Sequence, residues 1–156
     1  MSVERVREYL KEYQRENDVL EFSQSSATVE LAAQAVGVEP ARIAKTLSLR
    51  DRQGAMVVVV AGDAKLDNAR FKGRFEMKAR MLTAEEALVE TGYAVGGVCP
   101  FALPQGVTVW LDESLLRFET VFPACGSSNS AIEVTPKALA VLSKSSGWVD
   151  VCKGWQ

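Results

Sequence analysis

The sequence predicts an α+β fold in which a mixed, largely antiparallel, barrel-like β-sheet is surrounded by helices. Amphipathic stretches alternate with short apolar runs, but not with the strict strand-helix order of a parallel α/β protein. The chain has 156 residues, of which 47% are apolar and 24% are charged, as in ordinary globular proteins. Its longest apolar run, residues 55–61, is far shorter than the ~20 residues of a membrane span. We expect a single domain over residues 1–156.

The first half of the chain predicts two helices and a β-hairpin. Apolar residues at helical spacing predict an amphipathic helix over residues 2–17, and a short strand follows at 19–22. Thr28 can cap a second helix, which a glycine at position 37 closes. Residues 43–50 and 56–61 predict two strands joined by a turn of hairpin length. Because the second strand is apolar on both faces, we expect it in the middle of the sheet.

The second half begins with helices and continues mainly with strands. Residues 66–75 predict a basic helix, and Thr83 and Glu86 form the capping box of another helix that ends at Gly92. Residues 96–100 predict a loop because they contain two glycines and a proline. The remaining expected elements are strands at 107–111, 118–122, 131–134 and 148–151, and a helix at 136–142 that begins with proline.

The composition restricts the available chemistry. The chain contains no histidine, which excludes Ser-His-Asp and Cys-His mechanisms and histidine-based zinc sites as its own equipment. Its three cysteines form no C-x-x-C pair, so we expect a reducing compartment, the cytoplasm, and no structural metal or disulfide. Residues 39–80 carry ten basic and five acidic side chains, a net charge of +5. This excess predicts a local polyanion site, although a solvated helix face accounts for it equally well.

Lys45 is the first candidate for chemistry. Alternation along the predicted strand places it on the face of Ile43 and Leu47. An ammonium directed toward a core is paired, neutralised or aimed at an anion, and the alternative is that the side chain reaches water along its own methylene groups. A Ser-Lys dyad with Ser48 or Ser128 is chemically possible, but strand parity turns Ser48 away from Lys45.

Two loops and two cysteines are further candidates. The glycines at 96 and 97 can gather backbone N–H groups into an oxyanion site, or form an ordinary turn. Residues 126–130 offer hydroxyl and amide groups to a small polar ligand, or merely connect strands. Cys99 and Cys125 are candidate nucleophiles, although free cysteines are more often small buried groups.

Taken in order, several segments resemble one known family. They are Ile-Ala-Lys-Thr-Leu at 43–47, Val-Val-Val-Ala-Gly-Asp at 58–63, Thr-Gly-Tyr at 91–93, Gly-Gly-Val-Cys-Pro-Phe at 96–101 and Cys-Gly-Ser at 125–127. Over about residues 22–142 the sequence resembles the YbaK / prolyl-tRNA synthetase-associated editing domains. The resemblance implies a mixed β-barrel wrapped by helices. It also implies hydrolysis of the ester bond of mischarged aminoacyl-tRNA, without metal or cofactor.

The resemblance further implies a free-standing trans-editing factor. Its substrate would be a small amino acid of the Ala, Cys or Ser class on tRNA(Pro), and its partners would be that tRNA and an aminoacyl-tRNA synthetase, with no DNA and no membrane. Two other classes of function stay open. One is a non-catalytic tRNA- or synthetase-binding module on the same fold, and the other is a Ser-Lys or cysteine hydrolase of small esters.

The same resemblance implies roles for individual residues. Lys45 would position the terminal adenosine and phosphate end of the tRNA, and the loop at Gly96 and Gly97 would contact the ester. The implied substrate-binding residues are Phe22, Thr46, Asp63, Val98, Cys99, Pro100, Phe101, Gly126, Ser127, Ser128 and Asn129. The implied tRNA-binding residues are Lys65, Arg70, Lys72, Arg74 and Lys78, with Phe22 or Phe101 available to stack on the single-stranded end. Relatives often carry serine at the position of Cys99, so this residue is expected to line the pocket and to influence the choice of amino acid.

Overall fold

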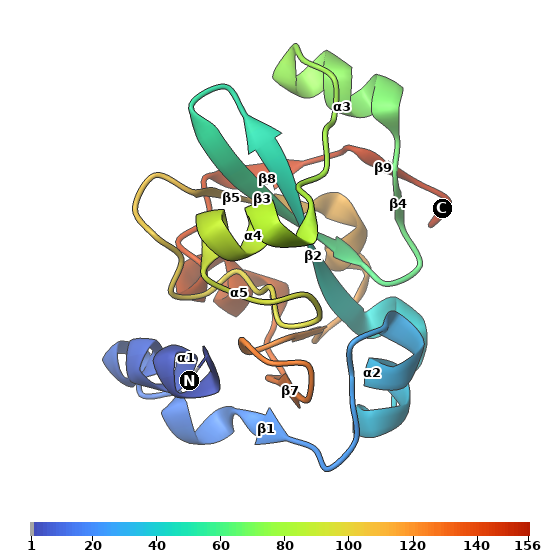
Figure 1. Cartoon of the computed structure of the whole chain (residues 1–156). Helices are drawn as coiled ribbons and strands as arrows, with labels where there is room; N and C mark the ends of the chain where they lie inside the picture. The colour runs from blue at the N-terminus through green and yellow to red at the C-terminus, as the bar shows by residue number, and fades with distance from the viewer. Residues whose placement is uncertain (1) are drawn as a thin grey trace.

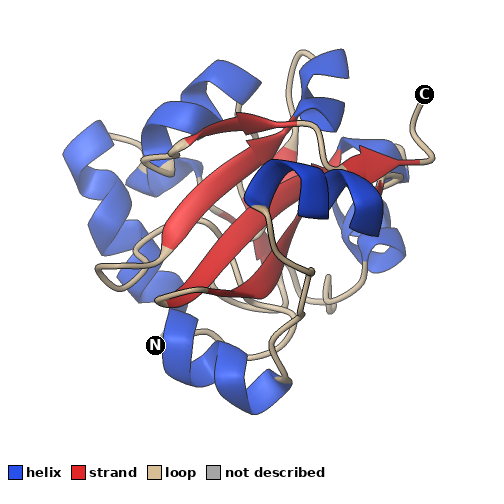
Figure 2. Cartoon of the chain, turned by 90° about the horizontal axis from the view of Figure 1, so that it is seen from above, coloured by secondary structure: helices blue, strands red, loops and turns tan. Residues whose placement is uncertain are grey.

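A curled, five-stranded sheet with the strand order β6-β2-β3-β5-β8 forms the centre of the protein, and helices surround it (Figure 1, Figure 2). The computed structural model describes residues 2–156. The strands of this sheet are β2 (Ile43–Asp51), β3 (Gly54–Ala61), β5 (Thr108–Asp112), β6 (Phe122–Pro123) and β8 (Gly147–Val149). Two small sheets pair β1 (Leu20–Glu21) with β7 (Ser130–Ala131), and β4 (Lys65–Leu66) with β9 (Cys152–Lys153). The helices are α1 (Ser2–Leu10), α2 (Val29–Val36), α3 (Asn68–Phe75), α4 (Ala84–Thr91) and α5 (Pro136–Leu142). The expected α+β fold with a mixed sheet is confirmed.

The β2-β3 hairpin is the centre of this sheet. The two strands pair antiparallel from Ala44 opposite Ala61 to Asp51 opposite Gly54, as the sequence predicts. Strand β3 lies between β2 and β5, which confirms its expected central place. The small sheets are antiparallel too, whereas β6, β5 and β8 join their neighbours in parallel. The parallel pairings arise because long connections with helices separate β3 from β5 and β5 from β8.

The core lies on both faces of β3. All four valines at positions 57–60 are fully buried. Helix α1 contributes Val6 and Leu10 to this core, α3 contributes Phe71, and α5 contributes Leu139. No helix within residues 2–156 has both the length and the apolar character of a membrane span.

The predicted caps define the helix ends. The Thr28 hydroxyl accepts a hydrogen bond from the Leu31 N–H, and Gly37 closes α2 with a left-handed φ of 76°. Thr83 and Glu86 form the complete capping box of α4. These side chains satisfy N–H groups that have no partner within the helix, which is why the sequence signal is reliable here.

Four expected elements differ from the structure. The helix expected over 2–17 ends at Leu10 and continues as 3₁₀ turns, because Gln14 adopts a left-handed conformation with φ 59°. The basic helix starts only at Asn68, because the Asp67 carboxylate caps it. The strands expected at 118–122 and 131–134 were too long: only β6 and β7 pair as strands, and one isolated bridge joins Val121 to Val134. The chain leaves β6 immediately for a turn at Gly126, which has φ 93°.

Candidate functional site

A cavity of about 260 Å³ lies beside β2. Its walls come from β2, from α2, from the start of α4, from the loop at 95–98 and from the turn between β6 and β7. Lys45, Thr46 and Ser48 line it from β2, and Gly96 and Val98 line it from the loop. The volume is slightly below the roughly 300–1,000 Å³ of typical sites for drug-sized ligands. The cavity therefore suits a small group rather than a whole nucleotide.

The cavity exists because one edge of β2 is partly open. Strand β6 pairs with this edge only at Ile43 and Ala44. Further along, residues 80–82 cover it through hydrogen bonds from the Leu82 N–H to the Ser48 carbonyl and from the Arg50 N–H to the Arg80 carbonyl. Between these two contacts no described strand pairs with the edge. Because alternate residues of a strand direct their main-chain groups to the same edge, the N–H and C=O of Thr46 face this opening.

Lys45 is half-buried on the cavity wall. Burial lowers the pKa of its ammonium, and the nearby Asp63 opposes that shift. Within residues 2–156 no carboxylate lies within ion-pair distance of the Lys45 Nζ. The side chain is therefore neither in the apolar core nor freely solvated. An anionic ligand that entered the cavity would offset the energetic cost of this partly desolvated charge.

Asp63 lies outside the cavity wall. Arg117 binds its carboxylate through two hydrogen bonds of 2.6 and 3.0 Å, and this contact holds the pKa of Asp63 below its usual value. The same guanidinium also donates to the Trp155 carbonyl at 3.2 Å. The structure thus places Asp63 in a surface ion pair beside the C-terminal segment, where it acts on Lys45 only through its charge.

The glycine loop contributes less to the cavity than the sequence predicts. Gly96 lines the cavity with a left-handed φ of 86°. Gly97 is buried behind it, and its N–H donates to the Ala94 carbonyl at 3.0 Å. A side-chain carbon at Gly97 would lie 2.8 Å from the Gly126 carbonyl oxygen, so the two loops touch main chain to main chain. The Gly97 N–H was expected to bind an oxyanion, but it already donates a hydrogen bond within this turn. This expectation is therefore corrected.

Cys99, Pro100 and Phe101 lie behind the cavity rather than on its wall, which corrects the expectation that Cys99 lines the pocket. Cys99 and Phe101 are fully buried. Burial raises the pKa of the Cys99 thiol to about 11, and its sulfur contacts the Phe101 carbonyl at 3.8 Å. The Phe101 ring packs against Tyr9, with the ring centroids 6.5 Å apart. Phe101 therefore has no free face for a nucleobase, and the expectation that it stacks on the tRNA end is wrong.

The loop at 126–130 holds together mainly through its own side chains. The Ser127 hydroxyl bonds to Asn129 Oδ1 at 2.9 Å and to Ser130 Oγ at 2.8 Å. Asn129 Nδ2 donates to the Phe22 carbonyl at 2.9 Å, so this loop anchors the segment that follows β1. Ser128 is exposed, and its Cβ lies near Gly96. Gly126 is buried against α1.

Several cavity residues were not predicted from the sequence. They are Ser26, Thr28 and the alanines Ala84 and Ala87 of α4. Ser48 and Ser130, which also line the cavity, did carry a signal, because Ser48 was a candidate dyad residue and Ser130 belongs to the polar loop at 126–130. The others reach the cavity through loop paths and helix placement that periodicity does not encode.

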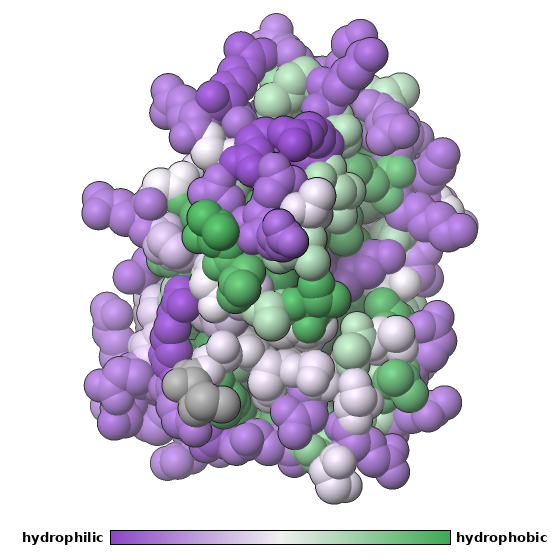
Figure 3. Space-filling model, in the orientation of Figure 1, coloured by the Kyte–Doolittle hydropathy of each residue, from purple (hydrophilic) through white to green (hydrophobic). Residues whose placement is uncertain are grey.

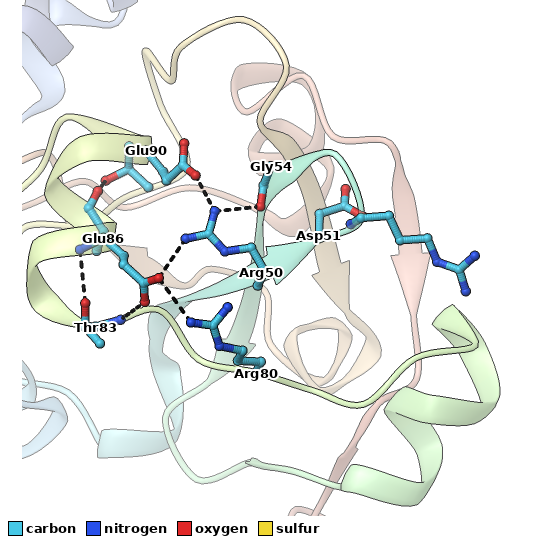
Figure 4. Close-up of polar contacts among 10 residues, drawn as sticks. Arg50, Asp51, Gly54, Arg80, Thr83, Glu86 and Glu90 are labelled. Carbon is cyan, nitrogen blue, oxygen red and sulfur yellow. Dashed lines mark hydrogen bonds and ion pairs between the residues drawn. The ribbon is translucent and has the colours of Figure 1, made fainter.

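Ion pairs fix the α4 wall of the cavity to β2. Arg50 of β2 points between Glu86 and Glu90 of α4 (Figure 4). Its guanidinium is 2.9 Å from Glu86 Oε2 and also donates to the Gly54 carbonyl at 3.1 Å. Arg80 approaches the same Glu86 oxygen at 3.2 Å. The contacts join the strand, the hairpin turn and the helix in one polar network.

Part of the surface around the cavity is apolar. Figure 3 shows hydrophobic side chains gathered on the face where α4 lies. Met81 and Val95 belong to the cavity wall and are exposed by 50% and 69%. Leu88 and Val89 are exposed on α4. The cavity therefore opens beneath an apolar rim.

The five predicted tRNA-binding cations lie on or near α3, which Figure 1 draws at the top of the molecule, away from α2 and β7. Lys65, Lys72 and Lys78 are exposed, and none has an ion pair with another described residue. Arg70 bonds to Asp150 at 2.9 Å. The Arg74 guanidinium lies over the ring of Trp110, 5.0 Å from its centroid. The three lysines are thus among the exposed cations of this surface that form no ion pair with another described residue.

Comparison with known proteins shows which family the chain belongs to. A family model described as the aminoacyl-tRNA editing domain matches residues 23–142. The chain is 54% identical over the full length of both proteins to YwhH of Bacillus subtilis, which is uncharacterized. It is 28% identical, over 78% of this chain and 75% of the relative, to EbsC of Enterococcus faecalis, a protein named as a candidate Cys-tRNA(Pro)/Cys-tRNA(Cys) deacylase. A crystal structure described as that of a candidate trans-editing enzyme for prolyl-tRNA synthetase superposes with a TM-score of 0.88 and 32% identity over 98% of each chain. With its curled mixed sheet and its cavity beside Lys45, the chain belongs to the aminoacyl-tRNA editing domain family.

Proposed function

We propose that the protein is an aminoacyl-tRNA deacylase that hydrolyses the ester bond of mischarged tRNA as a free-standing trans-editing factor. The observation that carries this proposal is Lys45, a half-buried ammonium with no ion-pair partner among residues 2–156, on the wall of a small cavity. Membership of the editing family and the similarity to EbsC support the same reaction class.

The chemistry asks little of the protein, because an aminoacyl ester is already activated. The Lys45 ammonium would bind the terminal adenosine and phosphate end of the tRNA and so hold the ester at the cavity mouth. The Thr46 main-chain N–H, which faces the opening, would stabilise the oxyanion as water attacks the carbonyl. The ester C–O bond then breaks, and the terminal ribose hydroxyl of the tRNA leaves with the proton that the attacking water gives up. A buried thiol whose pKa is raised to about 11 makes Cys99 a poor nucleophile, so thiol catalysis is disfavoured.

The proposed substrate is tRNA(Pro) carrying a small amino acid of the Ala, Cys or Ser class. The cavity of about 260 Å³ accommodates such groups. A synthetase pocket rejects small or isosteric side chains poorly, so a second hydrolytic site restores the missing selectivity. We further propose that the protein acts in the cytoplasm, where it meets aminoacyl-tRNA and an aminoacyl-tRNA synthetase.

The test is release of amino acid from a set of tRNA(Pro) species charged with alanine, cysteine, serine, 2-aminobutyrate or proline. The wild type is expected to release one or more of the small non-cognate residues and to spare proline. Lys45→Ala should lower that rate at least about 100-fold with an unfolding midpoint no lower than that of the wild type. The matched control is Lys137→Ala, which removes an exposed lysine of α5 outside the cavity. Binding of tRNA without release of any amino acid would instead identify a non-catalytic module.

A further inference from the structure

Two hydroxyl-bearing residues of β2 share one face of the strand and line the cavity. Thr46 and Ser48 are two residues apart on the strand, and both line the cavity. The Thr46 Oγ1 is buried and has no hydrogen-bond partner among residues 2–156. The Ser48 side chain belongs to the buried part of the protein, with only 8% of the residue exposed. Its carbonyl bonds to the Leu82 N–H, but its hydroxyl makes no hydrogen bond to another described residue.

Much of the remaining cavity wall is apolar, although the hydroxyl-bearing residues Ser26, Thr28, Thr83 and Ser130 also line it. Ala84 and Ala87 of α4, Val98 of the loop and Ala124 after β6 face the same cavity. No acidic side chain lines it, and Lys45 is its only charged lining residue within the described part of the chain. A buried hydroxyl without a partner is unfavourable, and a ligand that supplies a hydrogen-bonding group at this place removes that penalty. Cys99, which the sequence suggested for this role, is fully buried behind the loop.

We propose that Ser48, together with Thr46, selects the amino acid to be removed by hydrogen bonding to its side chain, so that seryl-tRNA is preferred over alanyl-tRNA. This inference rests on the proposed deacylase function. Its physical basis is that a polar site discriminates more strongly against a missing hydroxyl than an apolar site does against an added one. A site built to hydrogen bond a hydroxyl rejects the analogue that lacks it, because the polar groups of the site then stay unpaired. A purely apolar cavity of the same size has no such means of choosing serine.

The experiment compares kcat/KM for seryl-tRNA(Pro) and alanyl-tRNA(Pro). Ser48→Ala is expected to lower the seryl value more than the alanyl value, so that the seryl-to-alanyl ratio falls about three- to tenfold, as for the loss of one neutral hydrogen bond. Thr46→Val, which keeps the shape of the side chain, should shift the ratio in the same direction. The matched control is Ser143→Ala, because Ser143 is also a buried serine with an unpartnered hydroxyl but lies at the end of α5, outside the cavity. This control should leave the ratio unchanged.

A second measurement separates this inference from the proposed function. Binding of the non-hydrolysable amide analogues 3′-seryl-amino-adenosine and 3′-alanyl-amino-adenosine is measured by calorimetry for the wild type and the same variants. A wild type that releases no amino acid but prefers the seryl analogue, with the preference lost in Ser48→Ala, would contradict the deacylase and support the selection by Ser48. An equal effect of Ser48→Ala on both substrates and both analogues would overturn the role of Ser48, whether or not the wild type is an enzyme.

Discussion

At the scale of single residues, Lys45 lies where its charge is unfavourable for stability but well placed for the proposed binding of an anion. Its ammonium loses solvent on the cavity wall, and no carboxylate among residues 2–156 is close enough to compensate it by an ion pair. The protein thus bears a cost in stability to hold a cation on the wall of this cavity. Such a cost is common at functional sites, where replacement often increases stability and removes activity.

Lys45→Met is expected to be more stable than the wild type at neutral pH and to be inactive. The native pKa of Lys45 lies below its ordinary value of 10.5, so between these two pH values the unfolded chain binds more protons than the native one. The stability of the wild type therefore rises with pH across that window, whereas below the native pKa the full cost of the buried charge is present. Urea unfolding from pH 7 to 10.5 should show the advantage of the variant shrinking as the pH rises. A constant difference would mean that Lys45 is not desolvated in solution.

Cys99→Ser is expected to keep both the rate of hydrolysis and the ranking of substrates, because Cys99 is fully buried behind the cavity. A thiol whose pKa is raised to about 11 is almost entirely protonated at pH 7.5, so iodoacetamide should not abolish the proposed activity of the native protein. The measurements are kcat/KM over the substrate set and residual activity after alkylation. A folded but inactive Cys99→Ser protein would restore the cysteine as a nucleophile.

Some of the cavity was predictable from residue patterns, and some was not. Lys45 and Thr46 were predicted and do line the cavity, because strand alternation fixes the place of side chains on β2. Gly96 and Val98 also line it. For Cys99 and Phe101 no such rule exists: they follow a left-handed glycine in an irregular loop, where direction depends on contacts with distant segments such as Tyr9.

At the scale of elements, the cavity depends on how α4 is held against β2. The capping box at Thr83 acts at the start of the helix, whereas the Arg50 ion pairs hold both its first turn, at Glu86, and its last turn, at Glu90 (Figure 4). The caps of α2 and α4 were predictable because the signal is local to a few residues. The lengths of β6 and β7 were not, because a strand ends where its partner edge ends, and that edge belongs to β2 and β1 far away in the sequence.

Thr83→Ala is expected to lower the free energy of unfolding by about 0.5–2 kcal/mol, because the Glu86 N–H loses its acceptor. It should also raise KM, since the first turns of α4 form a wall of the cavity. Thr135→Ala is the control: it removes the equivalent cap of α5, which lies outside the cavity. Denaturant unfolding should give similar losses for both variants, and kinetics should separate them. Equal kinetic effects of both variants would show that α4 has no special influence on the site.

At the scale of the whole molecule, apolar and positively charged side chains gather on two different parts of the surface. The exposed apolar side chains of Met81 and Val95 lie at the cavity, while lysines without an ion pair to another described residue lie on and near α3 (Figure 3, Figure 1). A tRNA whose 3′ end enters the cavity would need to extend past β2 to reach these lysines. The net charge of −2 for the whole chain conceals this arrangement.

Replacing Lys65, Lys72 and Lys78 together by glutamine is expected to weaken tRNA binding and to reduce its dependence on salt. Each lysine that neutralises a phosphate releases counterions, so the slope of log K against log salt should decrease by up to about one unit per lysine. Filter binding between 50 and 200 mM KCl measures this slope, and Lys137→Gln serves as the control. An unchanged slope would place the tRNA on another surface of the protein.

The late position of β8 in the chain affects how the protein can fold during synthesis. Strand β3 finds its neighbour β2 at once, but β5 and β8 follow only after residues 108 and 147. At roughly 5–20 residues per second, the valine-rich β3 waits on the order of ten seconds for the sheet to be completed. During that interval an apolar strand with an unpaired edge leaves the ribosome, which is the situation that invites association between nascent chains. Slower elongation over residues 62–149 should therefore increase the dependence of the protein on chaperones, without any change in the stability of its native state.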